Sequence, residues 1–278
     1  MDKLLTDIHT HSKFSHDGID TLQDMLAAAA QKGLCFYGVS EHYDYDVYVK
    51  TGSRTWTDAN AEEYFHTARH LQEDYAGVLN VLIGYEYGYT DDEQGMQEYV
   101  AVTEKYKPDF VVNSVHTCHG LDYCGGAAFY TKDGKLRNKD EVYFEYLSLL
   151  RQCLDVPYTY DIVGHIGYAT RYAPYEDKSL SLQKYGAQID DILRTVIQKD
   201  KILEVNASNK GGTEPFLPQR DILKRYFQLG GRKISYASDA HGVSRIAEHR
   251  AMIVEMLKEI GFTYITVPCR GEHIKVEI

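Results

Sequence analysis

Near its start the chain reads Asp7-Ile8-His9-Thr10-His11, and near its end it reads Ser238-Asp239-Ala240-His241. Each stretch stands at the end of a short apolar run that is typical of a β-strand. Because side chains alternate along a strand, we expect His9 and His11 to share one face and to form a pair that can clamp a metal. The second stretch repeats this spacing with a carboxylate and an imidazole. We expect Asp7 to lie on the same face as the histidines and to orient one of the imidazoles.

Four further apolar runs end in a potential metal ligand, namely His42, Glu86, His116 and His165. Strand-like and helix-like segments alternate along the chain, as in a barrel of parallel strands joined by helices. The C-terminal ends of all strands of such a barrel meet at one mouth. We therefore predict an α/β fold, a distorted (β/α)7 TIM-like barrel with the active site at the C-terminal ends of the strands. The alternative is an open doubly wound sheet, but such a sheet gathers its ligands at one switch point.

The expected strands cover residues 4–9, 35–40, 78–85, 110–115, 161–166, 202–207 and 234–238, with a weaker one at 262–267. The expected helices cover residues 21–32, 58–75, 92–106, 140–154, 182–199, 218–229 and 249–260. Two long loops, 43–57 and 117–137, are expected to cover the substrate. We find no linker or low-complexity tract, and we expect residues 1–278 to form a single domain.

The composition limits the possible partners. A formal net charge of -11 argues against non-specific binding of nucleic acid. No apolar run approaches the about 20 residues of a membrane span. The cysteines are odd in number and include no C-x-x-C pair, which favours a reducing compartment and a cytoplasmic location. We expect a small-molecule substrate and neither nucleic acid nor membrane as a partner, and the oligomeric state stays open.

Four ordered motifs resemble those of the polymerase and histidinol phosphatase (PHP) superfamily. They are residues 7–11 with Ser15-His16-Asp17-Gly18, then Ser40-Glu41-His42, then Ser114-Val115-His116, and then residues 238–241. The resemblance covers nearly the whole chain. It implies a distorted seven-stranded barrel that holds three divalent metal ions.

The resemblance also implies which residues bind each metal. The three sets are His9, His11, Glu86 and Asp239; Glu86, His116 and His165; and Asp17, His42 and His241. Glu86 would bridge the first two ions. The choice between Asp17 and the adjacent His16 stays open. Imidazole and carboxylate ligands suit zinc best, with manganese, iron or cobalt as alternatives.

Such a centre favours hydrolysis of a phosphate ester. Three divalent ions keep a net positive charge after three carboxylate ligands and a bridging hydroxide are counted, and this charge matches a phosphate dianion. We expect a metal-bridging hydroxide to act as the nucleophile. The expected catalytic residues are Glu86, Asp239 and His241, with Asp239 as the proton shuttle.

Several polar residues near the strand ends are candidates for substrate binding. Arg171 is expected to neutralise the transition state, although a surface arginine paired with a carboxylate is the alternative. Asn206, Ser208 and Lys210 follow the sixth strand and are expected to contact the phosphate or the leaving group. Supporting contacts to the ligands are expected from Ser40, Glu41 and Asn113.

Chain length and motif spacing resemble the histidinol-phosphate phosphatases within the superfamily. This resemblance implies hydrolysis of L-histidinol phosphate to L-histidinol and inorganic phosphate in histidine biosynthesis. Tyr43 and Asp44, at the start of the first long loop, would suit the cationic histidinol moiety. The alternatives are a PHP phosphoesterase for another small phosphate or a nucleotide, a metal-dependent amidohydrolase, and a non-catalytic metal-binding module.

The second long loop holds a further group of potential ligands. Cys118 and Cys124 flank His119. We interpret both cysteines as free thiols of the loop rather than as zinc ligands.

Overall fold

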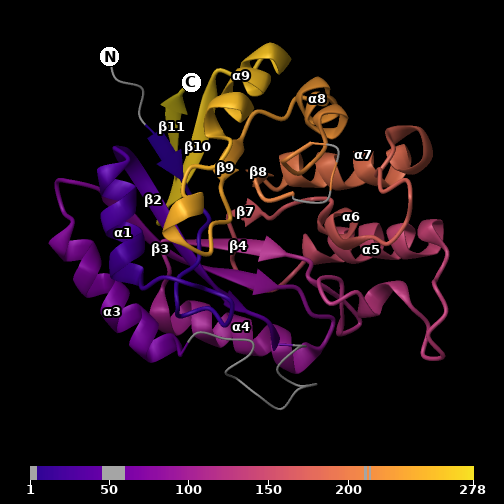
Figure 1. The fold of residues 1–278 in the computed structure, drawn as a ribbon, viewed down its shortest axis with the longest axis horizontal. Helices are drawn as coiled ribbons and strands as arrows, with labels where there is room; N and C mark the ends of the chain where they lie inside the picture. Colours follow the sequence, from indigo (N-terminus) through magenta and orange to yellow (C-terminus); the bar gives the residue numbers. More distant parts are fainter. Residues whose placement is uncertain (1–4, 46–59, 210–211, 213) are drawn as a thin grey trace.

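The structure is a computed structural model that describes residues 5–45, 60–209, 212 and 214–278. Seven parallel strands form a nearly closed barrel, as predicted (Figure 1). In spatial order they are β1 (Leu5–Asp7), β2 (Leu34–Tyr43), β3 (Asn80–Gly88), β4 (Phe110–Ser114), β7 (Ile162–Val163), β8 (Ile202–Asn206) and β9 (Ile234–Ala237). The barrel therefore follows the order of the strands along the chain.

The barrel closes between β1 and β9, where residues 7–11 meet residues 238–241. The backbone nitrogen of Asp239 donates to the carbonyl of His9 at 3.0 Å, and that of His11 donates to the carbonyl of Ala240 at 2.8 Å. Thr10 and Ala240 form a parallel bridge. Figure 1 shows the indigo start of the chain beside its yellow end. The closing seam thus brings residues from both ends of the chain to the mouth of the barrel.

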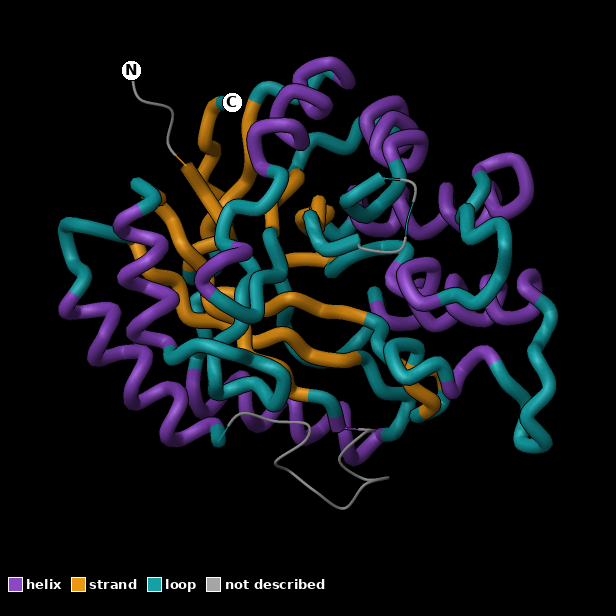
Figure 2. The backbone as a smooth tube through the Cα atoms, in the orientation of Figure 1, coloured by secondary structure: helices purple, strands orange, loops and turns teal. Residues whose placement is uncertain are grey.

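Helices surround the barrel (Figure 2). They are α1 (Leu22–Gln31), α3 (Ala61–Asp74), α4 (Glu93–Tyr106), α5 (Lys139–Cys153), α6 (Tyr168–Tyr172), α7 (Leu182–Gln198), α8 (Arg220–Gln228) and α9 (Arg250–Ile260). All but α6 were predicted at nearly these positions. Polar side chains cap several of them, as Thr21 does for α1 and Ser181 for α7, by accepting from a free N–H of the first turn. Among the described residues, every helix is too short or too polar to span a membrane.

The inward positions of the strands change from apolar to polar toward the mouth. An apolar cluster fills the lower barrel and consists of Ile8, Leu82, Phe110, Val112, Ile162, Ile202, Val267 and Val276. Side chains on the inward face of a strand recur every second residue. The inward face of β3 therefore leads from Leu82 to Glu86, and that of β8 leads from Ile202 to Glu204. The barrel therefore has an apolar floor, formed by this cluster, beneath a polar mouth.

The last strand-like run of the sequence does not join the barrel. It forms β10 (Tyr264–Cys269), which pairs antiparallel with β11 (Glu272–Glu277) in a separate hairpin. Val267 and Val276 of this hairpin belong to the apolar floor. Nε of Arg270, in the turn, donates to Oδ1 of Asp109 at 2.7 Å. The hairpin closes the lower end of the barrel and leaves the mouth for chemistry.

Candidate metal centre

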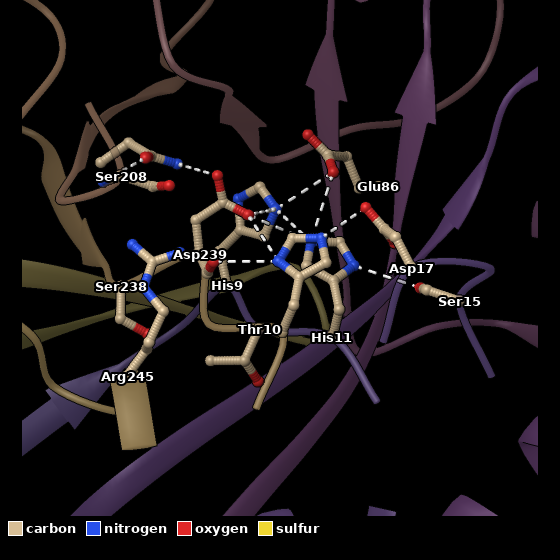
Figure 3. Close-up of polar contacts among 12 residues, drawn as sticks. His9, Thr10, His11, Ser15, Asp17, Glu86, Ser208, Ser238, Asp239 and Arg245 are labelled. Carbon is tan, nitrogen blue, oxygen red and sulfur yellow. Dashed lines mark hydrogen bonds and ion pairs between the residues drawn. The ribbon is translucent and has the colours of Figure 1, made fainter. Parts of the chain in front are cut away.

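The side chains predicted as metal ligands converge at the mouth of the barrel, and Figure 3 shows part of this cluster. Three groups have ligand atoms that all lie within 4.8 Å of one another: His9, His11 and Glu86; His42, Glu86 and His116; and His11, His42 and His241. The remaining predicted ligands lie beside these groups. His165 Nε2 is 2.7 Å from Glu86 Oε1, Asp239 Oδ1 is 3.4 Å from His11 Nε2, and Asp17 Oδ2 is 3.1 Å from His241 Nε2.

Glu86 lies at the centre of the cluster. Its Oε1 is 3.1 Å from His116 Nε2, and its Oε2 is 3.2 Å from His9 Nε2 and 3.0 Å from His42 Nδ1. Burial raises the pKa of this carboxyl, but the imidazoles of His9, His116 and His42 outweigh burial and hold the pKa well below its usual range. Each oxygen therefore faces a different group of imidazoles, which is the arrangement required of a bridging carboxylate.

Hydrogen bonds at Nδ1 orient several imidazoles so that Nε2 points into the cluster. His9 Nδ1 is 2.6 Å from Glu204 Oε1, and His116 Nδ1 is 2.8 Å from Asp44 Oδ1. A carboxylate at Nδ1 favours the tautomer whose Nε2 carries the lone pair. The Nε2 atoms of His9 and His11 lie only 3.0 Å apart. Imidazoles that face each other in this way fit a shared cation.

The charges of the cluster fit the same interpretation. Burial lowers the pKa of His9, but the carboxylates of Glu86 and Glu204 outweigh burial and raise it well above its ordinary value. Burial also lowers the pKa of His116, but the carboxylates of Asp44 and Glu86 outweigh burial and raise it well above its ordinary value. The buried carboxylates therefore favour positive charge at these imidazoles, and bound divalent cations would supply such charge.

Glu41 supports the cluster through serine hydroxyls, in line with its expected role. Ser15 Oγ donates to Glu41 Oε2 at 2.5 Å and accepts from the backbone nitrogen of His42 at 3.0 Å. The same oxygen lies 3.2 Å from His11 Nδ1. Asn113, in contrast, binds the carbonyl of Cys153 and does not reach the ligands. The expectation for Asn113 is therefore wrong.

Asp17 fits the third ligand group better than His16 does. Asp17 Oδ1 lies 3.7 Å from His42 Nε2, in addition to the contact of Oδ2 with His241. Burial raises the pKa of Asp17, but the imidazoles of His42 and His241 outweigh burial and lower it. The His16 ring centroid lies 5.6 Å from that of His42, so this ring stands at the edge of the group.

Arg171 reaches the cluster from α6. Its Nη1 donates to Asp239 Oδ2 at 3.3 Å, and its Nη2 donates to Asn206 Oδ1 at 3.1 Å. The guanidinium also lies over the rings of Tyr168 and Tyr172, at 5.1 Å and 5.9 Å from their centroids. Burial lowers the pKa of Arg171, but the charge of Asp239 outweighs burial and raises it. The structure thus places a fixed positive charge beside the metal-ligand cluster.

A pocket of about 480 Å³ opens beside this arginine. Its lining includes Ser208, whose backbone nitrogen donates to Asn206 Oδ1 at 2.9 Å. It also includes Tyr172 and Arg245, which the sequence analysis missed. Figure 3 shows Arg245 extending toward the side of the site where Ser208 and Asp239 lie. The only sequence signal for Arg245 was its place four residues after His241.

Three further residues were predicted to bind the substrate, namely Tyr43, Asp44 and Lys210. The Tyr43 side chain does not reach the pocket, because its ring packs against Tyr85 and Tyr99 and its hydroxyl donates to Glu98 of α4. This placement argues against a substrate contact by Tyr43. Asp44 lies in the site, but its Oδ1 orients His116. Lys210 lies outside the described residues.

The expectation for Asp7 is wrong. Its Oδ1 accepts from the backbone nitrogen of Ser238 at 2.8 Å, and its Oδ2 accepts from that of Ala247 at 2.9 Å. Burial raises the pKa of Asp7 to about 6 despite these bonds. Asp7 therefore fixes the seam of the barrel, while Glu204, which the sequence analysis missed, orients His9.

Comparisons with known proteins agree with this geometry. A family model described as the PHP domain matches residues 7–208. The histidinol-phosphatase of Lactococcus lactis subsp. lactis is 30% identical over 263 residues, which cover 92% of this chain and 91% of that protein. A probable histidinol-phosphatase of Clostridium acetobutylicum is 28% identical over 238 residues, which cover 86% of this chain and 87% of that protein.

A solved structure extends the likeness to the fold. The histidinol phosphate phosphatase of Lactococcus lactis subsp. lactis, complexed with Zn, L-histidinol and phosphate, superposes with a TM-score of 0.83 at 27% identity. The superposition covers 98% of this chain and 99% of that chain. Ordered motifs, barrel topology and family match agree, and the chain belongs to the PHP domain family.

Proposed function

We propose that this chain is a metal-dependent phosphomonoesterase that hydrolyses L-histidinol phosphate to L-histidinol and inorganic phosphate. One observation carries the proposal: the buried imidazoles and carboxylates around Glu86 lie beside the fixed guanidinium of Arg171. This pairing suits a phosphate dianion. The choice of ester is supported by the Lactococcus lactis enzyme, whose structure contains Zn, L-histidinol and phosphate.

We further propose that three divalent ions, with zinc as the first choice, occupy the three predicted ligand sets. When bound, these ions would supply Lewis-acid activation of the phosphoryl group and of the attacking water. Glu86 would hold two of the ligand sets together through its separate oxygens. Residues 1–278 as a single domain and a cytoplasmic location stay predictions.

The chain's own residues divide the remaining work. Arg171 and Asn206 lie on one side of Asp239, where they would bind the phosphoryl oxygens. The other oxygen of Asp239 faces the imidazoles of His11 and His241. We propose that Asp239 holds and transfers the proton for the leaving oxygen, with His241 and Glu86 as the other catalytic residues. A contact of Asp44 with the cationic part of the substrate stays a prediction.

A substrate panel tests the proposed function. The metal-loaded protein is assayed with L-histidinol phosphate, other small phosphomonoesters, a nucleotide and an amide. We expect kcat/KM to be at least about tenfold higher for L-histidinol phosphate than for the other esters, a difference of about 1.4 kcal/mol. Equal rates for all esters would favour a different phosphoesterase, and turnover of the amide alone would favour an amidohydrolase. Full metal content without any turnover would indicate a binding module.

Replacing Arg171 tests the phosphate subsite. We expect Arg171→Met to lower kcat/KM by about a hundredfold, because a buried cation stabilises the charge that develops on the phosphoryl oxygens. Metal content should not change, since no metal is assigned to this side chain. Arg232→Met, at an exposed arginine, is the matched control and should retain full activity. An Arg171→Met variant with unchanged kcat/KM would place the phosphate elsewhere.

Tyr146 of α5 positions the short helix that carries Arg171. Its hydroxyl oxygen accepts from the backbone nitrogens of Gly167 at 2.9 Å and Tyr168 at 3.1 Å. The N-cap residue of α6 is Gly167, which has no side chain to cap the helix itself. We expect Tyr146→Phe to lower kcat/KM by about tenfold, because the buried N–H of Gly167 loses its acceptor and that of Tyr168 keeps only the carbonyl of His165.

A double-mutant cycle separates this positioning role from a general loss of stability. If Tyr146 acts through Arg171, adding Tyr146→Phe to Arg171→Met should cost little further activity. Tyr143→Phe on the same helix is the control, since its hydroxyl bonds the carbonyl of Lys178. Additive losses in the cycle would contradict the positioning role.

A further inference from the structure

A second group of potential ligands lies outside the proposed metal centre. Cys118, His119 and Glu145 have ligand atoms within 4.8 Å of one another. Cys118 ends the short strand β5 (Thr117–Cys118), which pairs with β6 (Leu121–Asp122), and Glu145 lies on α5. The group therefore joins the second long loop to a helix of the barrel wall.

The geometry of His119 resembles that of a metal-binding imidazole. Its Nδ1 lies 2.8 Å from Asp91 Oδ2, and its Nε2 lies 3.6 Å from Glu145 Oε1. A carboxylate at one ring nitrogen fixes the tautomer that offers the other nitrogen to a metal. Tetrahedral zinc ligands, with bonds of about 2.1 Å, are separated by about 3.4 Å. The pair is thus close to the spacing that a shared ion requires.

Glu145 is also oriented for such a role. Arg137 Nη2 donates to Glu145 Oε2 at 2.7 Å, while Nη1 of the same arginine donates to the carbonyl of Ala128 at 3.0 Å. The arginine thereby holds one carboxylate oxygen and leaves Oε1 on the side of His119. The two oxygens of Glu145 have separate partners.

The exposure of the three side chains gives an ion a path to the group. Cys118 is buried at 2% exposure, whereas the His119 side chain is 58% exposed and that of Glu145 is 28% exposed. A metal could therefore enter from solvent past His119 and meet the sulfur at the base. Three protein donors leave the fourth tetrahedral position to water.

We propose that Cys118, His119 and Glu145 bind one divalent ion of the zinc type, with Asp91 orienting His119. Mixed sulfur, nitrogen and oxygen donors suit zinc better than magnesium or calcium. The ion's two charges, together with that of Arg137, would balance a thiolate and the carboxylates of Glu145 and Asp91. The proposal replaces our sequence-based interpretation of Cys118 as a free thiol, and it does not depend on the proposed function.

Such an ion would tie the β5–β6 hairpin to α5 directly after His116. This histidine belongs to the proposed catalytic centre and stands two residues before Cys118. This additional ion would therefore have a structural role, because it fixes the segment that follows a catalytic ligand.

Cobalt substitution of the whole protein tests the proposal without an activity assay. A thiolate bound to Co²⁺ gives a charge-transfer band in the near ultraviolet, whereas imidazole and carboxylate ligands do not. The predicted ligands of the main centre include no cysteine, so the band reports on the second site alone. We expect the band in the wild-type protein, and we expect Cys118→Ser to abolish it and to lower the cobalt content by one ion per chain.

Two further variants make the result decisive. Cys124→Ser, at an exposed thiol of the same loop, should retain the band. His119→Gln changes an exposed side chain and should weaken cobalt binding at this site even if Cys118→Ser fails to fold. A cobalt-loaded wild-type protein without the band, or a band that persists in folded Cys118→Ser, would overturn the proposal.

Discussion

Glu86→Gln should reduce kcat for L-histidinol phosphate by at least about a thousandfold, a loss of about 4 kcal/mol of transition-state stabilisation. Both oxygens of Glu86 contact imidazoles, with His165 and His116 on one side and His9 and His42 on the other. An amide offers one neutral oxygen in place of a charged bidentate bridge. The variant should therefore lose bound metal together with activity, and both kcat and the metal content per chain should be measured.

A matched substitution separates this effect from the general consequence of removing a carboxylate. Glu104 lies on the exposed side of α4, so Glu104→Gln should retain full turnover and full metal content. A Glu86→Gln protein that keeps more than about a tenth of wild-type kcat would show that the two ligand groups act without a carboxylate bridge.

Removing metal from the wild-type protein should have an equally large effect. After dialysis against a chelator, we expect turnover to fall by at least about a thousandfold, because the remaining side chains cannot activate water or neutralise the phosphoryl oxygens alone. Zinc, manganese or cobalt should restore activity. Turnover and elemental content should be followed in the same samples, so that each recovered ion is related to recovered rate.

Chelation should also lower thermal stability. Ligands that bind only the folded state stabilise it, by about 4 kcal/mol at a free concentration a thousand times Kd. The buried negative charge around Glu86 and Glu204 should add to the loss, because its counter-ions are gone. Activity that survives when the metal content has fallen to zero would contradict the proposed mechanism, whatever the melting temperature.

The fold and the ligand cluster could be predicted from the sequence because both depend on short-range patterns. Parallel strands end at one edge, so residues that follow the apolar runs must meet there. Glu86 and His116 could be placed in this way without knowledge of any long-range contact. Every helix but α6 could be predicted in the same way, because apolar residues recur at helical spacing along each of them.

The wrong predictions for Tyr43 and Asp7 arise where the alternation of side chains along a strand continues beyond, or stops before, the predicted end of that strand. β2 runs to Tyr43, beyond its predicted end, so alternation turns His42 inward and Tyr43 outward. β1 ends at Asp7, so the alternation expected from Asp7 to His9 fails. Glu204 was missed although a lone carboxylate within the run Ile202-Leu203-Glu204-Val205-Asn206 was itself a signal of a buried role.

The strand with which each strand pairs could not be predicted from the sequence. The alternating pattern of residues 262–267 fits a barrel strand as well as a hairpin, and only tertiary contacts decide between them. Arg245 and Tyr172 reach the pocket from short helical segments whose direction no local pattern fixes.

The seam between β1 and β9 has a consequence for how the protein is made in the cell. His9 and His11 leave the ribosome early, whereas Asp239 and His241 leave it near the end of synthesis. The hydrogen bonds that join these stretches cannot form before then. Seven of the nine predicted metal ligands therefore precede the last two during synthesis, and complete loading with metal has to wait until the polypeptide is almost finished.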